Sequence, residues 1–213
     1  DSEKVNLEDA RRRGDRIEEK KALSVMGLAF TQLGQTPKAI QLFEEQLEIT
    51  RELGDVQEEL GVLANLGDAF AVSGEINRAK RHYQEQLLRA DSSRYQPFVA
   101  SALNGIGFIY VKQNQISRAI ECYSKALKIY RELENHEKEL ELLVGIGLNY
   151  QKLGQLEQMT NALKQALEAA KFLEDRKEEA QILVDLGEAY FHRGNLEPSN
   201  ACLDRAEEIL NFR

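Results

Sequence analysis

The 213-residue chain has no tryptophan, only three prolines and only two cysteines. No apolar run approaches the roughly 18–20 residues that a membrane-spanning helix needs, so we expect no membrane insertion. Cys122 and Cys202 lie far apart and imply no disulfide framework, which favours a reducing, cytoplasmic setting. Positive charge is also in deficit: the formal net charge is −8, which argues against a nucleic-acid partner. With few prolines and 42% hydrophobic residues, the composition favours a helical globular protein.

Glycine, by contrast, is present 14 times, and its positions repeat. One set recurs every 40 residues, and an aromatic residue stands three positions after each member: Gly27, Gly67, Gly107, Gly147 and Gly187. Seven positions after that set stands a second one: Gly34, Gly74, Asn114, Gly154 and Gly194. A glycine inside a helix costs about 0.5–1 kcal/mol relative to alanine, so five of them in phase indicate a structural requirement. A fixed period between 20 and 50 residues is typical of a repeat architecture.

Each 40-residue unit reads as two helices. In the first, which we call helix A, the glycine leaves room for a neighbouring helix and the aromatic residue fills the gap between helices. The second glycine, or Asn114, suits the left-handed residue that ends a helix. Thr36 and Pro37 resemble an N-cap followed by a proline in the first turn of the second helix, helix B. Helix B is expected to be amphipathic, as over residues 116–133.

This skeleton of Leu-Gly-x-x-Tyr, Gly, Ala, Phe/Tyr and Ala-Leu, seen best in residues 104–127, resembles the tetratricopeptide repeat (TPR). The ordinary unit has about 34 residues. The longer unit here is similar to the arrays of kinesin light chains, Pins-type adaptors and bacterial regulatory proteins. The resemblance implies an all-α, right-handed superhelical solenoid of antiparallel helix pairs, with about eleven helices. We expect a single array over residues 1–213: the tail of a preceding repeat at 1–15, then repeats at 16–55, 56–95, 96–135, 136–175 and 176–213.

No residue pattern indicates catalysis. The three histidines lie at different depths of the repeat: His82, His136 and His192. His82 shares its repeat position with Cys122 and Cys202, but a zinc site needs about four convergent ligands and no others are supplied. We therefore predict no enzyme activity, no catalytic residues, no cofactor and no metal. The alternative is a regulatory or sensor array that controls a fused effector or enzyme domain outside this segment.

The resemblance also implies that helix A lines a concave groove. Its predicted peptide-binding residues combine apolar, amide and charged side chains: Asn65, Asp68, Asn104, Phe108, Lys112, Leu148, Lys152, Asp185 and Glu188. Such a mixture suits a peptide, whose backbone needs hydrogen bonds and whose side chains need pockets. Of the carboxylate clamp found in chaperone-binding TPR domains only Asn65 is present, which disfavours an Hsp70 or Hsp90 tail. The predicted function is a protein–protein interaction scaffold or adaptor.

Two further expectations concern the floor and the end of this array. Gly61, Gly105 and Gly145 are expected to leave the groove floor low, so that a peptide can approach the helices. In the last helix Leu203, Ile209 and Leu210 lack a covering repeat, and exposed apolar patches tend to bind partners. End-to-end self-association through the terminal helices is therefore a further possibility for the function.

Overall fold

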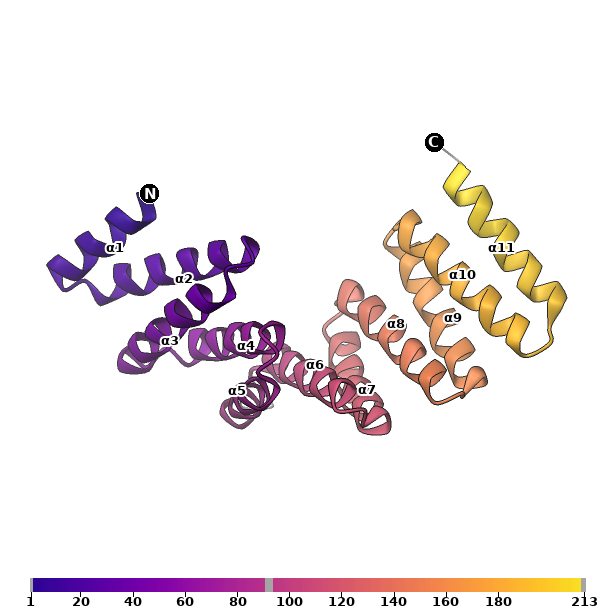
Figure 1. The fold of residues 1–213 in the computed structure, drawn as a ribbon, viewed down its shortest axis with the longest axis horizontal. Helices are drawn as coiled ribbons and strands as arrows, with labels where there is room; N and C mark the ends of the chain where they lie inside the picture. The colour runs from indigo at the N-terminus through magenta and orange to yellow at the C-terminus, as the bar shows by residue number, and fades with distance from the viewer. Residues whose placement is uncertain (1, 91–93, 212–213) are drawn as a thin grey trace. The chain divides into compact units, whose positions relative to one another are not determined.

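The structure, a computed structural model, describes residues 2–90 and 94–211, and over these residues it contains eleven α-helices and no strand (Figure 1). The A helices begin at intervals of 40 residues: α2 (Arg16–Gln32), α4 (Val56–Val72), α6 (Gln96–Lys112), α8 (His136–Lys152) and α10 (Arg176–His192). The B helices follow them: α3 (Thr36–Leu53), α5 (Ile76–Arg89), α7 (Ile116–Glu132), α9 (Leu156–Phe172) and α11 (Leu196–Asn211). A shorter helix, α1 (Ser2–Arg13), precedes α2 at the position of a B helix. The predicted all-α class is confirmed.

The chain forms two compact units, Asp1–Ile109 and Tyr110–Arg213. In the first unit α1 packs against α2, α2 against α3, α3 against α4 and α4 against α5, and in the second unit the helices α7, α8, α9, α10 and α11 pack successively in the same way. Short connections between packed neighbours make these helices antiparallel pairs.

Loop residues determine where the helices end and begin. The predicted second set of residues takes the left-handed conformation, with φ values of 69° at Gly34, 82° at Gly74, 57° at Asn114, 69° at Gly154 and 78° at Gly194. Side-chain oxygens cap four A helices by accepting the backbone N–H three residues on: Asp15, Asp55, Asn135 and Asp175. The predicted N-cap at Thr36 is wrong by one residue. The carbonyl of Gln35 accepts the amides of Lys38 and Ala39, so Gln35 is the N-cap and Thr36 is already helical.

Four glycines of the first set each contact a bulky side chain of the following B helix. A Cβ atom built on Gly27 would lie 2.5 Å from the ring of Phe43, and one on Gly67 would lie 2.4 Å from the ring of Tyr83. In the second unit Leu163 stands 3.0 Å from such an atom on Gly147, and Leu203 occupies the same place at Gly187. In each case the partner lies 16 residues after its glycine. The room that the sequence predicts for a neighbouring helix is therefore taken up, at these four glycines, by one bulky side chain of that helix.

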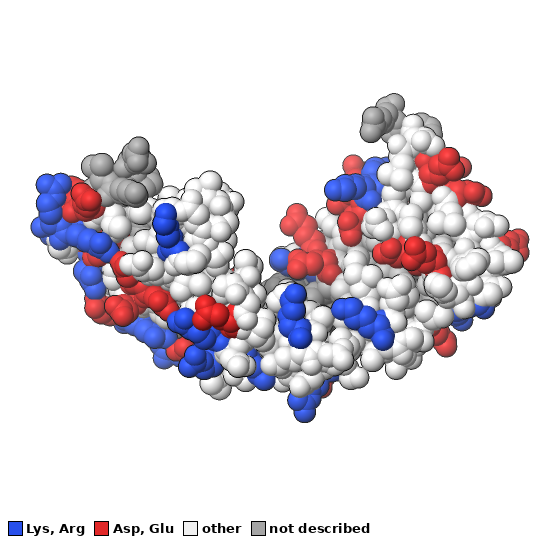
Figure 2. All heavy atoms as spheres, viewed as in Figure 1, with Lys and Arg blue, Asp and Glu red and all other residues white. Residues whose placement is uncertain are grey.

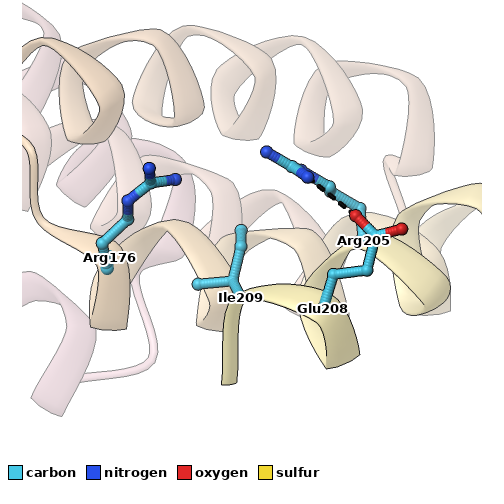
Figure 3. A pocket seen from close by; sticks show the side chains of 4 residues that line it. All are labelled: Arg176, Arg205, Glu208 and Ile209. Atoms are coloured by element: carbon cyan, nitrogen blue, oxygen red, sulfur yellow. Dashed lines mark hydrogen bonds and ion pairs between the residues drawn. The ribbon is translucent and has the colours of Figure 1, made fainter. Parts of the chain in front are cut away.

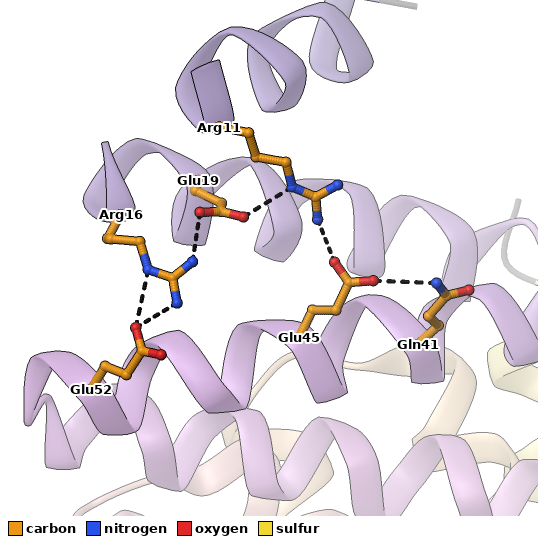
Figure 4. A network of polar contacts seen from close by, with 6 residues as sticks. All are labelled: Arg11, Arg16, Glu19, Gln41, Glu45 and Glu52. Carbon is orange, nitrogen blue, oxygen red and sulfur yellow. Dashed lines mark hydrogen bonds and ion pairs between the residues drawn. The ribbon is translucent and has the colours of Figure 1, made fainter. Parts of the chain in front are cut away.

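Arginines of the B helices link three consecutive helices. Arg11 of α1 donates to Glu19 of α2 over 2.9 Å and also pairs with Glu45 of α3 (Figure 4). Arg51 repeats this arrangement one period later, with Glu59 of α4 and Glu85 of α5. In the second unit Arg131 donates to Glu139 and to Gln165 of α9, over 2.7 and 2.8 Å. On the face drawn in Figure 2, acidic and basic side chains accordingly lie interspersed over the first unit.

Glu59 is the most buried carboxylate in this set, with a side chain only 3% exposed. Burial alone would raise the pKa of Glu59, but hydrogen bonds from Arg89 and Arg51 outweigh it and hold the pKa below its ordinary value.

The glycine contacts predict opposite effects for two Gly→Ala substitutions in A helices. Gly67→Ala should destabilise the fold by about 1–3 kcal/mol, because its Cβ would overlap the ring of Tyr83, which is buried. Gly145→Ala should stabilise it by about 0.5–1 kcal/mol, since its Cβ meets nothing within 4 Å and alanine favours helix. Urea unfolding followed by circular dichroism measures both. Equal effects for the two variants would contradict the packing of Tyr83 on Gly67 and the open space at Gly145.

The ion pairs of Glu59 should make its contribution to the free energy of unfolding depend on pH. Because its pKa is lower in the folded than in the unfolded state, its stabilisation is present above the ordinary glutamate pKa and is lost as pH falls through the folded value. Glu59→Gln should lower the free energy of unfolding by about 1–3 kcal/mol at pH 7. The difference from the parent should shrink below pH ~4. Glu132→Gln, which removes an exposed carboxylate 4.0 Å from Lys128, is the control and should have little effect at either pH.

Candidate functional site: the exposed face of the A helices

Each A helix has one buried face and one solvent-exposed face. On α2, for example, Ala22, Leu23 and Met26 are buried, while Val25 and Leu28 are exposed. We call the solvent-accessible side of the A helices, at the repeat positions of Ser24, Val25, Leu28 and Gln32, the A-helix face. All nine predicted peptide-binding residues lie on this face, four of them in the first unit and five in the second.

In the first unit the A-helix face carries Asn65 and Asp68 on α4, and Asn104 and Phe108 on α6. Asn65 and Asn104 are half-buried, and Phe108 is 37% exposed. Asp68 already has an intramolecular role, because its Oδ1 accepts a 2.6 Å hydrogen bond from the hydroxyl of Tyr83.

The expected low floor at Gly105 is wrong. A Cβ atom on this buried residue would lie 2.4 Å from the ring of Tyr83, so the ring occupies the space that a ligand would need. Tyr83 thus packs against both Gly67 and Gly105. A Cβ atom built on Gly145 would meet no atom within 4 Å, and one built on Gly61 would lie 4.0 Å from the ring of Phe98.

In the second unit the face carries Lys112, Leu148, Lys152, Asp185 and Glu188. Leu148 is 40% exposed and stands one repeat after Phe108 in the sequence. Lys152 lines a cavity of about 630 Å³ together with Asn114, Gln115 and Arg118. Asp185 accepts a 3.1 Å hydrogen bond from Gln181. Burial, with Glu188 nearby, nevertheless raises the pKa of Asp185, so keeping this carboxylate charged costs stability.

A second pocket was not predicted from the sequence. It has a volume of about 410 Å³, and we call its lining residues the acidic pocket: Glu137, Leu140, Glu141, Leu173, Asp175 and Glu178. Four carboxylates and two leucines from α8, α10 and the connection before α10 meet here. The sequence signal was available, because Asp175 and Glu178 are in phase with Asp55 and Glu58 three repeats earlier.

A third pocket, of about 440 Å³, is lined by Arg176 of α10 and by Arg205, Glu208 and Ile209 of α11 (Figure 3). Arg205 donates to Glu208 over 2.7 Å. On α11 Leu203 is 41% and Leu210 is 59% exposed, and Ile209 is half-buried.

The surroundings of His82, Cys122 and Cys202 indicate packing and do not indicate a reactive or metal-binding role. His82 stacks on Phe70 with ring centroids 5.3 Å apart, and burial lowers its pKa. Burial raises the pKa of the Cys122 and Cys202 thiols, which disfavours the reactive thiolate. Within residues 2–90 and 94–211 no group of three or more His, Cys, Asp or Glu residues is arranged to hold a metal ion. No helix in this part of the chain is long and apolar enough to cross a bilayer.

Helix pairs with a 40-residue period, glycine–side-chain packing within four of the pairs and an exposed A-helix face define a helical repeat protein. Residues 58–132, 98–171 and 138–211 match one family model described as tetratricopeptide repeat, and residues 22–57 match a second with the same description. The chain belongs to the tetratricopeptide repeat family. Proteins of this family are generally non-catalytic modules for protein interaction. No curated protein matches the sequence significantly.

Solved structures agree with this assignment. BtubC (BKLC) from P. vanneervenii has a TM-score of 0.85 at 23% identity, covering 98% of this chain and 88% of that chain. A putative kinesin light chain from Podosopora anserina with nearly identical TPR-like repeats has a TM-score of 0.73 at 17% identity, over 89% and 94%. A signal transduction ATPase with numerous domains from Pyrococcus horikoshii, which carries a tetratricopeptide repeat sensor, gives 0.79 at 19%, over 91% and 30%. At these identities the likeness shows the fold alone.

Proposed function

We propose that this chain is a protein-interaction scaffold or adaptor that binds a segment of a partner protein on its A-helix face. One observation carries the proposal: Phe108 in the first unit and Leu148 in the second, at the same repeat position, keep 37% and 40% of their surface exposed, each on the A-helix face of its own unit. Apolar side chains that helix packing leaves partly uncovered suit the anchoring of a ligand side chain.

The polar residues of the face support the same proposal. Asn65 and Asn104 each offer a donor and an acceptor to a peptide backbone, whose polar groups cannot be buried unpaired without loss. Asp185 supports a binding role because its charge costs stability where it stands, and perturbed groups concentrate at functional sites. Lys112 and Lys152 would favour an acidic residue in the ligand, and Asp185 and Glu188 a basic one.

No catalytic activity or cofactor is part of this proposal, and neither is a nucleic-acid partner, since the net charge is −8. A cytoplasmic location, inferred from two unpaired cysteines, also belongs to the proposal. The alternative of a sensor array that controls a fused effector is favoured by the Pyrococcus horikoshii protein, in which such a repeat is described as the sensor of an ATPase. Both alternatives require a ligand on the repeats.

Peptides selected from a phage-displayed library on the whole chain provide the test. Phe108→Ala should weaken the binding of a selected peptide at least about tenfold, because loss of a central anchor commonly costs about 2 kcal/mol. Leu148→Ala should have the same effect on peptides that bind the second unit. Fluorescence anisotropy with labelled peptide measures the affinities.

The matched control is Phe172→Ala, which removes an exposed phenylalanine from a B helix, where its ring contacts His136. We expect nearly parental affinity for this variant. Parental affinity for Phe108→Ala and Leu148→Ala, with a loss for Phe172→Ala, would move the binding surface to the B helices and contradict the proposal.

A second candidate function is self-association through α11, which the exposure of Leu203 and Leu210 favours. The double substitution Ile209→Glu with Leu210→Lys should then lower the weight-average sedimentation coefficient at high protein concentration. Leu88→Lys, at a leucine 87% exposed on α5, is the control and should leave it unchanged. A chain that sediments as a monomer at every concentration would rule this candidate out.

A further inference from the structure

The repeat contains an internal example of a lysine bound by two carboxylates. Lys20 of α2 is buried, with a side chain only 9% exposed, and its ammonium lies 3.2 Å from Asp55 and also pairs with Glu58. Asp55 is the N-cap of α4 and Glu58 lies in its first turn. Gln46 of α3 donates a further 3.1 Å hydrogen bond to the Glu58 carboxylate. An ammonium between two carboxylates therefore joins the first two A helices.

Three repeats later the carboxylates are present without the lysine. Asp175 caps α10 as Asp55 caps α4, with nearly the same backbone angles, φ −80° and ψ 84° against φ −82° and ψ 83°. Glu178 follows at the position of Glu58. Leu140, however, stands at the repeat position of Lys20.

Both groups that hydrogen-bond to Glu58 are replaced beside Glu178. Leu140 takes the place of Lys20 and Ala166 that of Gln46, and neither side chain can donate a hydrogen bond. Among the described residues no cation lies within ion-pair distance of Asp175 or Glu178. The acidic pocket, with its volume of about 410 Å³, lies at this place.

The other two junctions between A helices carry no such pair. Tyr95 and Phe98 stand at the two carboxylate positions in the third repeat, and Asn135 and Lys138 in the fourth. The carboxylate pair thus occurs at two junctions, filled by a lysine at one and open at the other.

We infer that the acidic pocket binds the side chain of a lysine on a partner protein, which would occupy the place that Lys20 has between the first two A helices. The inference rests on the proposed protein-binding function and names the chemistry of one contact. Leu140 and Leu173 offer apolar walls to the methylene stem of the lysine, and Asp175 and Glu178 accept hydrogen bonds from its ammonium. Glu137 adds negative charge, while Glu141 is already paired with Lys138 at 2.6 Å.

Two small probes that differ by one ammonium group test the pocket directly. Nα-acetyl-lysine N-methylamide should produce saturable shifts in the NMR amide signals of Leu140, Leu173 and Glu178 in the whole 15N-labelled chain. Nα-acetyl-norleucine N-methylamide, which lacks the ammonium, should bind roughly fivefold more weakly or worse, and Glu178→Gln should reduce the lysine response similarly. Equal binding of the two probes would show an apolar pocket only and overturn the inference. Spermidine binding without acetyl-lysine binding would assign the pocket to free polyamines and overturn it as well.

Leu140→Lys tests the internal comparison without any ligand. The introduced ammonium should pair with Asp175 and Glu178, so the melting temperature should change by less than ~3 °C and the acetyl-lysine response should disappear. The matched control is Leu60→Lys, a buried leucine at the same repeat position with Tyr95 and Phe98 in place of the carboxylates. It should lower the melting temperature by roughly 10 °C or more, because its ammonium is buried without a carboxylate. Equal losses for the two variants would overturn the inference.

Peptides selected on the whole chain separate this inference from the proposed function. Those that contain lysine should bind Leu140→Lys and Glu178→Gln more weakly than the parent, and replacement of their lysine by norleucine should weaken binding to the parent. Peptides that respond to Phe108→Ala but not to Leu140→Lys would overturn the inference and leave the proposed function standing. If no peptide is selected at all, the proposed function itself fails.

Discussion

In four of the five helix pairs, a glycine of helix A contacts a bulky side chain of the following helix B. Tyr83 shows the constraint most clearly, because Cβ atoms on Gly67 and on Gly105 would both lie 2.4 Å from its ring. The ring fixes the approach of α5 to α4 and touches α6, and its hydroxyl holds Asp68. The helix propensity lost at a glycine is thus offset by close packing of a large buried side chain.

Polar contacts then join one repeat to the next, and they vary more than the packing does. Arg11, Arg51 and Arg131 repeat one bridge to the next two helices, whereas Lys20 links α2 to α4 by an ion-pair network that does not recur among the residues that the structure describes. Where such a residue is replaced, as Lys20 is by Leu140, the repeat keeps its backbone but changes its surface chemistry. Differences between repeats, and not the repeat itself, are therefore where binding chemistry can arise.

The fold could be predicted from the sequence because the period places the same residue types at the same structural positions. Gly34 and Asn114 ended helices in the left-handed conformation as predicted. The predictions that failed depended on atomic contacts that the spacing of residue types does not specify. The sequence predicts open space at Gly105, but the ring of Tyr83 occupies that space. It predicts an N-cap at Thr36, but the carbonyl of Gln35 accepts the first amides of the helix. The acidic pocket becomes apparent only when the residues at two junctions between A helices are compared. The recurrence of a single residue type every 40 residues does not reveal it.

A double-mutant cycle on Gly67 and Tyr83 tests the glycine contact most directly. The free energy of unfolding would be measured by urea denaturation for the parent, Gly67→Ala, Tyr83→Leu and the double variant. Leucine is the residue that fills this place at Gly147 and Gly187, at 3.0 Å, so it should leave more room for an added Cβ atom. Gly67→Ala should then cost at least about 1 kcal/mol less in the Tyr83→Leu background than in the parent. Strictly additive effects would contradict the account, because they would mean that the glycine is required for some reason other than the ring that lies on it.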